Sequence, residues 1–207
     1  MMNIRQFRLL RLCAVGLSLA GCSLLNPPKG ITSRSFVLTP IHGPAPTAQS
    51  GPTNTIVGIR RVKMPAYLSG KPFAMRQNSN EIVYLESAEW AEPLDTALQR
   101  VLAADLGALI PTDKVRLSLW GPNDVTVEVD VNVERFDVDS HGEAVLSVWW
   151  RVLSPGGEKV LASGRFASTL KGPPPITDPG GAAASMSALA ADLAQKLEET
   201  IKRGIKP

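Results

Sequence analysis

The amino-acid sequence predicts an α/β protein built on a mixed, largely antiparallel sheet with two main helices packed on it. Two stretches, one beginning at Pro93 and one after Gly181, repeat apolar residues at helical spacing. Several other stretches alternate apolar and polar residues, as strands with one covered face do. The elements follow the order strands, helix, four strands, helix, without an internal repeat, which argues for a sheet with helices packed on it.

Residues 1–21 have the layout of a secretory signal peptide, in which arginines precede an apolar run too short to span a bilayer. The sequence Leu-Ala-Gly-Cys at positions 19–22 is the pattern of a bacterial lipobox. We therefore expect cleavage between Gly21 and Cys22, a diacylglycerol thioether on Cys22 and acylation of the new amino group. The alternative is an ordinary cleaved signal followed by a chance cysteine.

A lipid anchor would hold the folded part beside a membrane. Each buried acyl methylene contributes about 0.8 kcal/mol, so two or three chains hold a protein far longer than one chain does. Residue 23 is serine rather than the aspartate that retains lipoproteins in the inner membrane of enteric-type bacteria. Ser23 therefore favours the periplasmic leaflet of the outer membrane. We expect a signal peptide over 1–21, a lipidated tether over 22–34 and a single periplasmic domain over 35–207.

Charge and cysteine content narrow the choice of partners and sites. The formal net charge of +3 arises from Arg5, Arg8 and Arg11 in the signal region, and the rest of the chain balances acidic and basic residues. This balance gives no argument for nucleic acid as a partner. Cys13 leaves with the signal and Cys22 carries lipid, so we expect a domain without disulfides that is stabilised by packing alone.

Two proline-rich segments flank a short strand at the start of the domain. Pro27 and Pro28 belong to the tether, and residues 35–38 form the strand. Residues 40–54 contain several prolines and glycines and therefore predict a surface loop. Residues 55–62 are β-branched and apolar in their first half, which predicts a strand covered on both faces.

A hairpin, a helix and a further strand come next. Residues 73–76 and 81–85 form two short strands around a polar turn. The period then becomes helical at Pro93, a residue suited to the first helical position, and Pro111 ends the helix. Residues 114–120 predict another strand. The apolar stripe of the helix consists of Leu94, Ala97, Leu98, Val101, Leu102 and Leu109.

An antiparallel meander forms the second half of the sheet. Residues 124–134 alternate strictly, with valines on one face and mostly acidic residues on the other, so one face must contact water. The alternation changes phase at Arg135 and Phe136, which predicts a bulge or a strand end. Residues 144–153 and 159–170 provide the next two strands.

The chain closes with a helix. A break rich in glycine and proline covers residues 172–181. Apolar residues at helical spacing then run from Met186 to Ile201. Two cations followed by Gly204 predict the end of this helix.

Acidic and histidine side chains offer few candidates for chemistry. Glu128, Asp130 and Glu134 share one strand face, and paired carboxylates are the catalytic groups of glycosidases. Catalysis would need a cleft that keeps one of them from water, whereas the pattern indicates a solvated strand face. A periplasmic, cell-wall-associated hydrolase is therefore the alternative function. His42 and His141 lack neighbouring ligands, so we predict no metal site, no cofactor and no catalytic residue.

Aromatic side chains provide candidate contact residues. Strand neighbours point to opposite faces, so Trp149 lies outside the core if Trp150 lies inside it. An exposed tryptophan often marks an interface, and the alternative is that a second layer covers Trp149. Trp90 is either an interface anchor or a residue that locks the helix start. Tyr67 and Leu68, in a proline-flanked loop, complete the predicted partner or oligomer interface.

Two motifs carry a family resemblance. At Pro65-Ala66-Tyr67-Leu68 and Trp90-Ala91-Glu92-Pro93-Leu94 the chain resembles the PqiC-type auxiliary lipoproteins of ABC-type and MCE transport systems. The likeness includes the lipobox, the valine-rich meander and the C-terminal helix. Where family members commonly have an acidic residue and then Arg-Pro after the Tyr-Leu pair, this chain has Ser69-Gly70-Lys71-Pro72.

The resemblance implies an α/β domain with a mixed sheet, no enzymatic activity and a role in lipid trafficking between two membranes. In that picture an inner-membrane MCE protein spans the periplasm, and the lipoprotein receives its tip at the outer membrane. A homo-oligomeric ring of subunits is compatible with this role.

Overall fold

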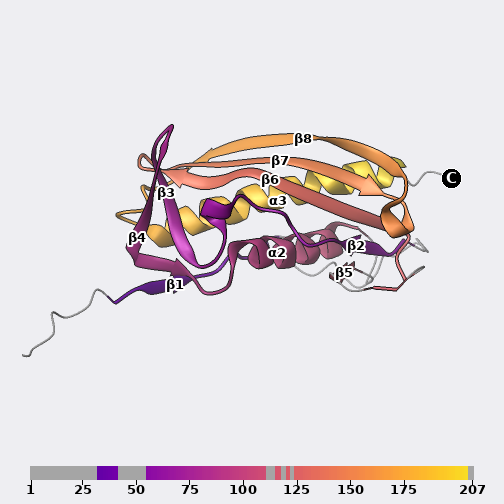
Figure 1. The fold of residues 1–207 in the computed structure, drawn as a ribbon, viewed down its shortest axis with the longest axis horizontal. Helices are drawn as coiled ribbons and strands as arrows, with labels where there is room; N and C mark the ends of the chain where they lie inside the picture. The colour runs from indigo at the N-terminus through magenta and orange to yellow at the C-terminus, as the bar shows by residue number, and fades with distance from the viewer. Residues whose placement is uncertain (1–31, 42–54, 111–114, 118–119, 122–123, 205–207) are drawn as a thin grey trace, which may run out of the picture. The chain divides into compact units, whose positions relative to one another are not determined.

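Three long strands form one side of the sheet. β6 (Val127–Asp139), β7 (Glu143–Leu153) and β8 (Val160–Lys171) are an antiparallel meander in which β7 pairs with both other strands (Figure 1). The meander agrees with the prediction from the alternating sequence. From Ser33 onward the chain forms one compact unit. The computed structural model describes residues 32–41, 55–110, 115–117, 120–121 and 124–204.

The other edge of β6 is shared by two strands that run parallel to it. β2 (Val57–Ile59) pairs with the start of β6, and β3 (Pro72–Asn78) pairs with its end. The connection between β2 and β3 includes a short 3-10 helix, η1 (Ala66–Leu68). The remaining strands are β4 (Glu81–Trp90), antiparallel to β3, β1 (Arg34–Phe36), parallel to β4, and β5 (Val115–Leu117), parallel to β2. The predicted mixed sheet is therefore confirmed.

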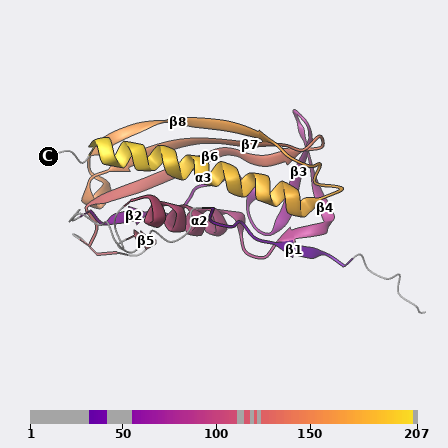
Figure 2. The same cartoon turned by 180° about the vertical axis from the view of Figure 1, so that it is seen from behind.

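Both predicted helices are present, and they pack against each other. α3 (Pro179–Gly204) lies along one face of β6, β7 and β8, and α2 (Leu94–Leu109) contacts α3 and β5 (Figure 2). Pro93 precedes α2 as its N-cap residue and is not the first helical residue. The predicted stop at Pro111 lies outside the described residues.

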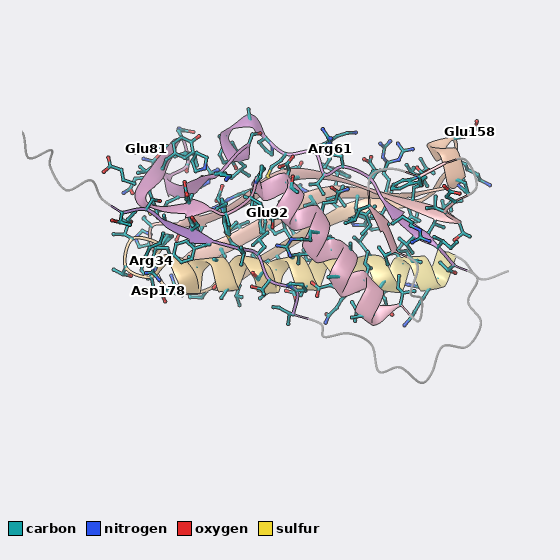
Figure 3. The ribbon with its side chains drawn as sticks, turned by 90° about the horizontal axis from the view of Figure 1, so that it is seen from below. Arg34, Arg61, Glu81, Glu92, Glu158 and Asp178 are labelled. Atoms are coloured by element: carbon teal, nitrogen blue, oxygen red, sulfur yellow. The ribbon has the colours of Figure 1, made fainter. Side chains whose placement is uncertain are left out.

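α3 begins earlier than its apolar pattern suggests. Its first residue is Pro179, within the predicted break, because Asp178 caps the helix: the Gly181 backbone N–H donates to Asp178 Oδ1 at 2.9 Å. Figure 3 shows Asp178 beside the first turn of α3. The helix ends at Gly204 as predicted. In the part of the chain that the structure describes, no helix is long and apolar enough to cross a membrane.

The core lies between the meander and the two helices. A register shift between Val133 and Arg135 confirms the predicted bulge, and it returns Phe136 and Val138 to the buried face. The apolar residues of β6 and β7 that belong to the core therefore lie on the helix side of the sheet. The principal core side chains of these elements are Val127, Val129, Val131, Val133, Leu146, Val148, Trp150, Leu98, Leu102, Leu189, Leu193 and Leu197.

Candidate functional site

The outer face is the face of β6, β7 and β8 turned away from α3, and it is the side seen in Figure 1. It presents the acidic side chains of β6. Each of these carboxylates is paired with cations that come from other parts of the chain. The acidic residues are Glu128, Asp130, Glu134 and Asp137.

Glu128 connects three segments near the start of β6. Arg60 Nε donates to Glu128 Oε2 at 2.6 Å. Trp120 Nε1 donates to Glu128 Oε1 at 3.1 Å, and the Gly156 backbone N–H donates to the same oxygen at 2.9 Å. Gly156 belongs to η2 (Pro155–Gly157), the turn between β7 and β8. Glu128 therefore holds Arg60, Trp120 and the η2 turn together at this end of the sheet.

Asp130 is shared by two cations. Arg151 Nε, on the neighbouring strand β7, donates to Asp130 Oδ2 at 3.1 Å. Lys63 Nζ, from the segment after β2, lies 3.7 Å from Asp130 Oδ1. Both cations remain partly exposed while the carboxylate is buried, so this position carries one surplus positive charge at the surface.

Asp137 forms a buried cluster at the other end of β6. Arg76 Nη2 and Arg135 Nε each lie 2.8 Å from the Asp137 carboxylate, and the Tyr67 hydroxyl donates to it at 3.0 Å. Burial, together with the charge of Asp137, raises the pKa of Tyr67 to about 12. The hydrogen bond to Asp137 raises the pKa of Arg76. As at Asp130, two cations share one carboxylate, and here both are guanidinium groups.

These contacts correct the prediction for the acidic strand face. Glu128 and Asp130 are only 2% and 4% exposed, so they do not form the solvated face that alternation suggested. Their oxygens accept hydrogen bonds from guanidinium, indole and backbone N–H groups, so they act as structural ion pairs. Nothing in this arrangement resembles two carboxylates facing each other across a cleft, which the hydrolase alternative needs.

Trp149 is the exposed aromatic residue at the centre of the outer face. Its side chain is 51% exposed, whereas Trp150 is 6% exposed, as alternation predicted if Trp150 joined the core. Trp149 Nε1 donates to Glu134 Oε1 at 2.8 Å, and the Arg165 guanidinium lies 5.9 Å from the Trp149 ring centroid. Since Arg165 also pairs with Glu134 at 2.8 Å, the indole is held in one orientation.

Glu134 is held as an anion by its neighbours. The Ser147 hydroxyl donates to Glu134 Oε2 at 2.8 Å, and this hydrogen bond is the largest contribution to a lowered pKa of Glu134. The indole of Trp149 and the guanidinium of Arg165 lower the pKa further. A shallow pocket of about 350 Å³ lies beside this group, between Trp149, Arg151 and Lys63.

The predicted interface residues divide into surface and core. Leu68 and Trp90 are buried at 3% and 1% exposure, so the interface prediction is corrected for both. Trp90, the last residue of β4, stacks on Phe73 of the paired strand β3 with ring centroids 4.8 Å apart. Tyr67 is half-buried, with its hydroxyl engaged by Asp137 and its ring beneath Arg76. Trp149 alone of the four is widely exposed.

The remaining predicted residues contribute no site geometry. Gly21, Cys22, Ser23 and His42 lie outside the described residues. His141 is exposed in the turn between β6 and β7. Within the described ranges, no group of three histidine, cysteine, aspartate or glutamate side chains could hold a metal ion.

Sequence reasoning missed the basic residues of the outer face. Arg151 and Arg165 were detectable in principle, because they occupy outward positions on two neighbouring strands. Arg60, Lys63 and Arg76 had no local signal. They reach β6 only because β2, β3 and the segment between them line its edge.

Comparisons with known proteins give a consistent result. A family model described as "ABC-type transport auxiliary lipoprotein component" matches residues 36–198. "Intermembrane transport lipoprotein PqiC" of Escherichia coli (strain K12) is 28% identical over 134 residues, which cover 64% of this chain and 67% of the relative. The protein of the same name from Shigella flexneri matches equally well.

Two solved structures share the fold. The crystal structure of an uncharacterized protein has a TM-score of 0.60 and 22% sequence identity, and the match covers 84% of this chain and 99% of that one. The Xanthomonas campestris protein XCC0632 has a TM-score of 0.61 and 17% identity, with 79% and 92% of the two chains covered. At these identities the likeness concerns the fold alone.

Proposed function

The chain belongs to the family of ABC-type transport auxiliary lipoprotein components, and from this premise we propose that it is a non-catalytic subunit of an intermembrane lipid transport system. In this proposal Cys22 anchors the domain in the periplasmic leaflet of the outer membrane, and the domain docks a periplasm-spanning, MCE-type component. The observation that carries the proposal is the family match over residues 36–198, which includes every described strand except the first residues of β1.

The N-terminal sequence supports the location. The lipobox ends at Gly21 and Cys22, and lipid on Cys22 would supply the membrane affinity. Ser23 favours export to the outer membrane under the sorting rule of enteric-type bacteria. The tether then leaves the domain free to meet a partner in the periplasm.

The outer face supports a docking role. Its carboxylates are held in ion pairs, and Trp149 is exposed in a fixed orientation between them. A rigid, half-exposed tryptophan on a sheet is typical of an interface anchor. A ring of identical subunits around the partner's tip is part of the proposal.

Crosslinking in intact membranes, followed by identification of captured proteins, tests the function. We expect an MCE-type transport protein in the outer-membrane fraction, together with crosslinked multimers of this chain. Trp149→Ala should reduce capture of the transport component. The control variant Tyr84→Ala, which removes a similarly exposed aromatic ring from a different strand, β4, should not. Capture of wall glycan without any transport component would contradict the proposal.

A further inference from the structure

β8 is an unusually long strand to stand at the edge of a sheet. It has 12 residues and pairs with β7 along its length except at Leu161, and no other described strand pairs with it. The opposite side of β8 therefore presents a row of backbone N–H and C=O groups. Proteins usually protect such an edge with proline, with charged side chains, with bulges or by keeping the strand short, and β8 carries Arg165 and Lys171. β8 contains no proline and has one register shift, at its first residues.

The two sides of β8 differ in chemistry. Residues opposite the core positions of β7 face the core side, and among them Phe166 is partly buried while Leu170 remains well exposed. Residues opposite Trp149 and Arg151 face outward and include Arg165 and Ser163. A strand added at this edge would thus place alternate side chains beside Phe166 and Leu170 on the core side and beside Arg165 and Lys171 on the outward side.

The outer face has more cations than carboxylates. Arg151 and Lys63 share Asp130 at one end, and Arg76 and Arg135 share Asp137 at the other. Arg61 is exposed and lies on the side of the domain away from α3 (Figure 3). Glu128 and Glu134 are each paired with one arginine, so the surplus positive charge lies at Asp130, whereas Asp139 and Glu143 add carboxylates near the Asp137 end.

We propose that the β8 edge binds an extended, acidic segment of a partner polypeptide as an added strand. Alternate acidic side chains of that segment lie over the outer face beside Arg165 and the pocket at Trp149. Its intervening apolar side chains lie beside Phe166 and Leu170. This inference rests on the proposed docking function and names the chemistry of the segment that docks.

Two other occupants fit less well. A membrane surface with anionic headgroups would match the cations and Trp149, but it has no backbone to pair with the row of groups along β8. A second copy of β8 would supply a backbone, but β8 contains Arg165 and Lys171 and no acidic residue. Pairing two copies would therefore add like charges across the new strand pair.

Peptide binding to the full chain in detergent tests the proposal. The probe is a labelled dodecapeptide of alternating glutamate and valine. One control is a peptide of alternating lysine and valine. The other control has the same composition as the probe, but all its glutamates precede all its valines. We expect the alternating acidic peptide to bind at least tenfold more tightly than either control, measured by fluorescence anisotropy. Hydrogen exchange should show new protection in β8.

Two matched variants identify the site. Arg165→Gln should weaken binding of the acidic peptide about fivefold or more, because Arg165 lies on the outward side of β8. Arg203→Gln removes a cation from a similarly exposed ion pair on α3, with Glu199, and should leave binding unchanged. Equal binding of acidic and basic peptides, or equal effects of the two variants, would overturn the proposal.

Further outcomes separate this inference from the proposed function. Trp149-dependent binding to anionic phospholipid vesicles without peptide binding would overturn the inference, as would self-association that Arg165→Gln abolishes. If membranes still yield the transport component when Arg165→Gln is introduced, the docking function stands and the β8 inference fails. If no transport component is captured at all, the docking function fails while peptide binding at β8 is judged by the measurements above.

Discussion

At the scale of single residues, two adjacent tryptophans have opposite roles. Trp150 lies over Gly164 of β8, where a Cβ atom would come within 2.7 Å of the ring, so the pocket for this indole depends on glycine. Trp149 is on the other side of the strand, held by Glu134 and Arg165. The same residue type therefore contributes packing at one position and contact surface at the next.

Alanine substitution should separate the two roles. Trp150→Ala should reduce the free energy of unfolding by about 3–5 kcal/mol, because it empties core volume. Trp149→Ala should cost about 1 kcal/mol or less, since it removes only surface contacts. Urea denaturation of both variants measures the difference. Equal losses would mean that Trp149 is also a packing residue, which would remove it from the proposed interface.

Tyr67 should titrate at unusually high pH. The chain has two tyrosines, so in a Tyr84→Phe variant the phenolate absorbance reports Tyr67 alone. We expect a midpoint of about 12 in the folded protein, because burial and Asp137 disfavour the phenolate. The same variant in denaturant should titrate near the ordinary value of 10.0. A midpoint near the ordinary value in the folded state would contradict the buried cluster.

The raised pKa of Tyr67 also predicts the direction of a stability change. At pH values between 10.0 and about 12 the unfolded chain has lost the Tyr67 proton and the folded chain retains it. The folded state then binds more protons, so the free energy of unfolding falls as pH rises through this window. The contribution of Tyr67 to the free energy of unfolding is fully present below pH 10.0 and is lost as the pH rises to about 12.

At the scale of elements, the start of α3 depends on one side chain. Asp178 caps the helix ahead of Pro179, and the first turn then contains Gly180 and Gly181, which have poor helix propensity. The helix covers β6, β7 and β8, so its first turn helps close one end of the core. A capping residue therefore stabilises this helix more than it would a helix whose first turn contains residues of high helix propensity.

Removing the cap should destabilise the domain measurably. Asp178→Ala should lower the free energy of unfolding by about 1 kcal/mol, while Asp178→Asn, which keeps a capping oxygen, should cost much less. Denaturant unfolding of both variants gives the comparison. If the alanine and asparagine variants proved equally stable, the cap would not be what starts α3 at Pro179.

At the scale of the whole molecule, the two faces of the sheet serve different purposes. Helix α3 covers one face with apolar contacts, and the other is lined by ion pairs that leave surplus cations and Trp149 exposed. The near balance of charge along the domain sequence therefore conceals an uneven distribution in space. The basic outer face is where we expect an acidic partner.

Membrane attachment should depend on one residue of the full chain. Cys22→Ser should leave the protein unprocessed or released from the membrane, because the acyl chains supply nearly all of the affinity. Metabolic labelling with a radioactive fatty acid, followed by fractionation of inner and outer membranes, measures both lipidation and location. Label in the serine variant would contradict lipidation at Cys22, and wild-type protein in the inner membrane would contradict the assignment from Ser23.

The sequence by itself determined the types of the main helices and strands, the meander and the opposite facing of Trp149 and Trp150, and it predicted a bulge or a strand end at Arg135 and Phe136. These features depend on the period of the side chains along a single segment, which is a local property. Only the tertiary structure decided that Leu68 and Trp90 are buried, because burial depends on side chains of other elements, such as Phe73 of β3, which stacks on Trp90.

The ion pairs that Arg60 and Lys63 make on the outer face also came from tertiary structure alone. Glu128 and Asp130 look solvated in their own strand, since alternation places them opposite the valines. Arg60 and Lys63 bury them because β2 and the segment after it run along the edge of β6. Parallel pairing of that kind joins residues about 70 positions apart through backbone hydrogen bonds, which have no side-chain period to detect.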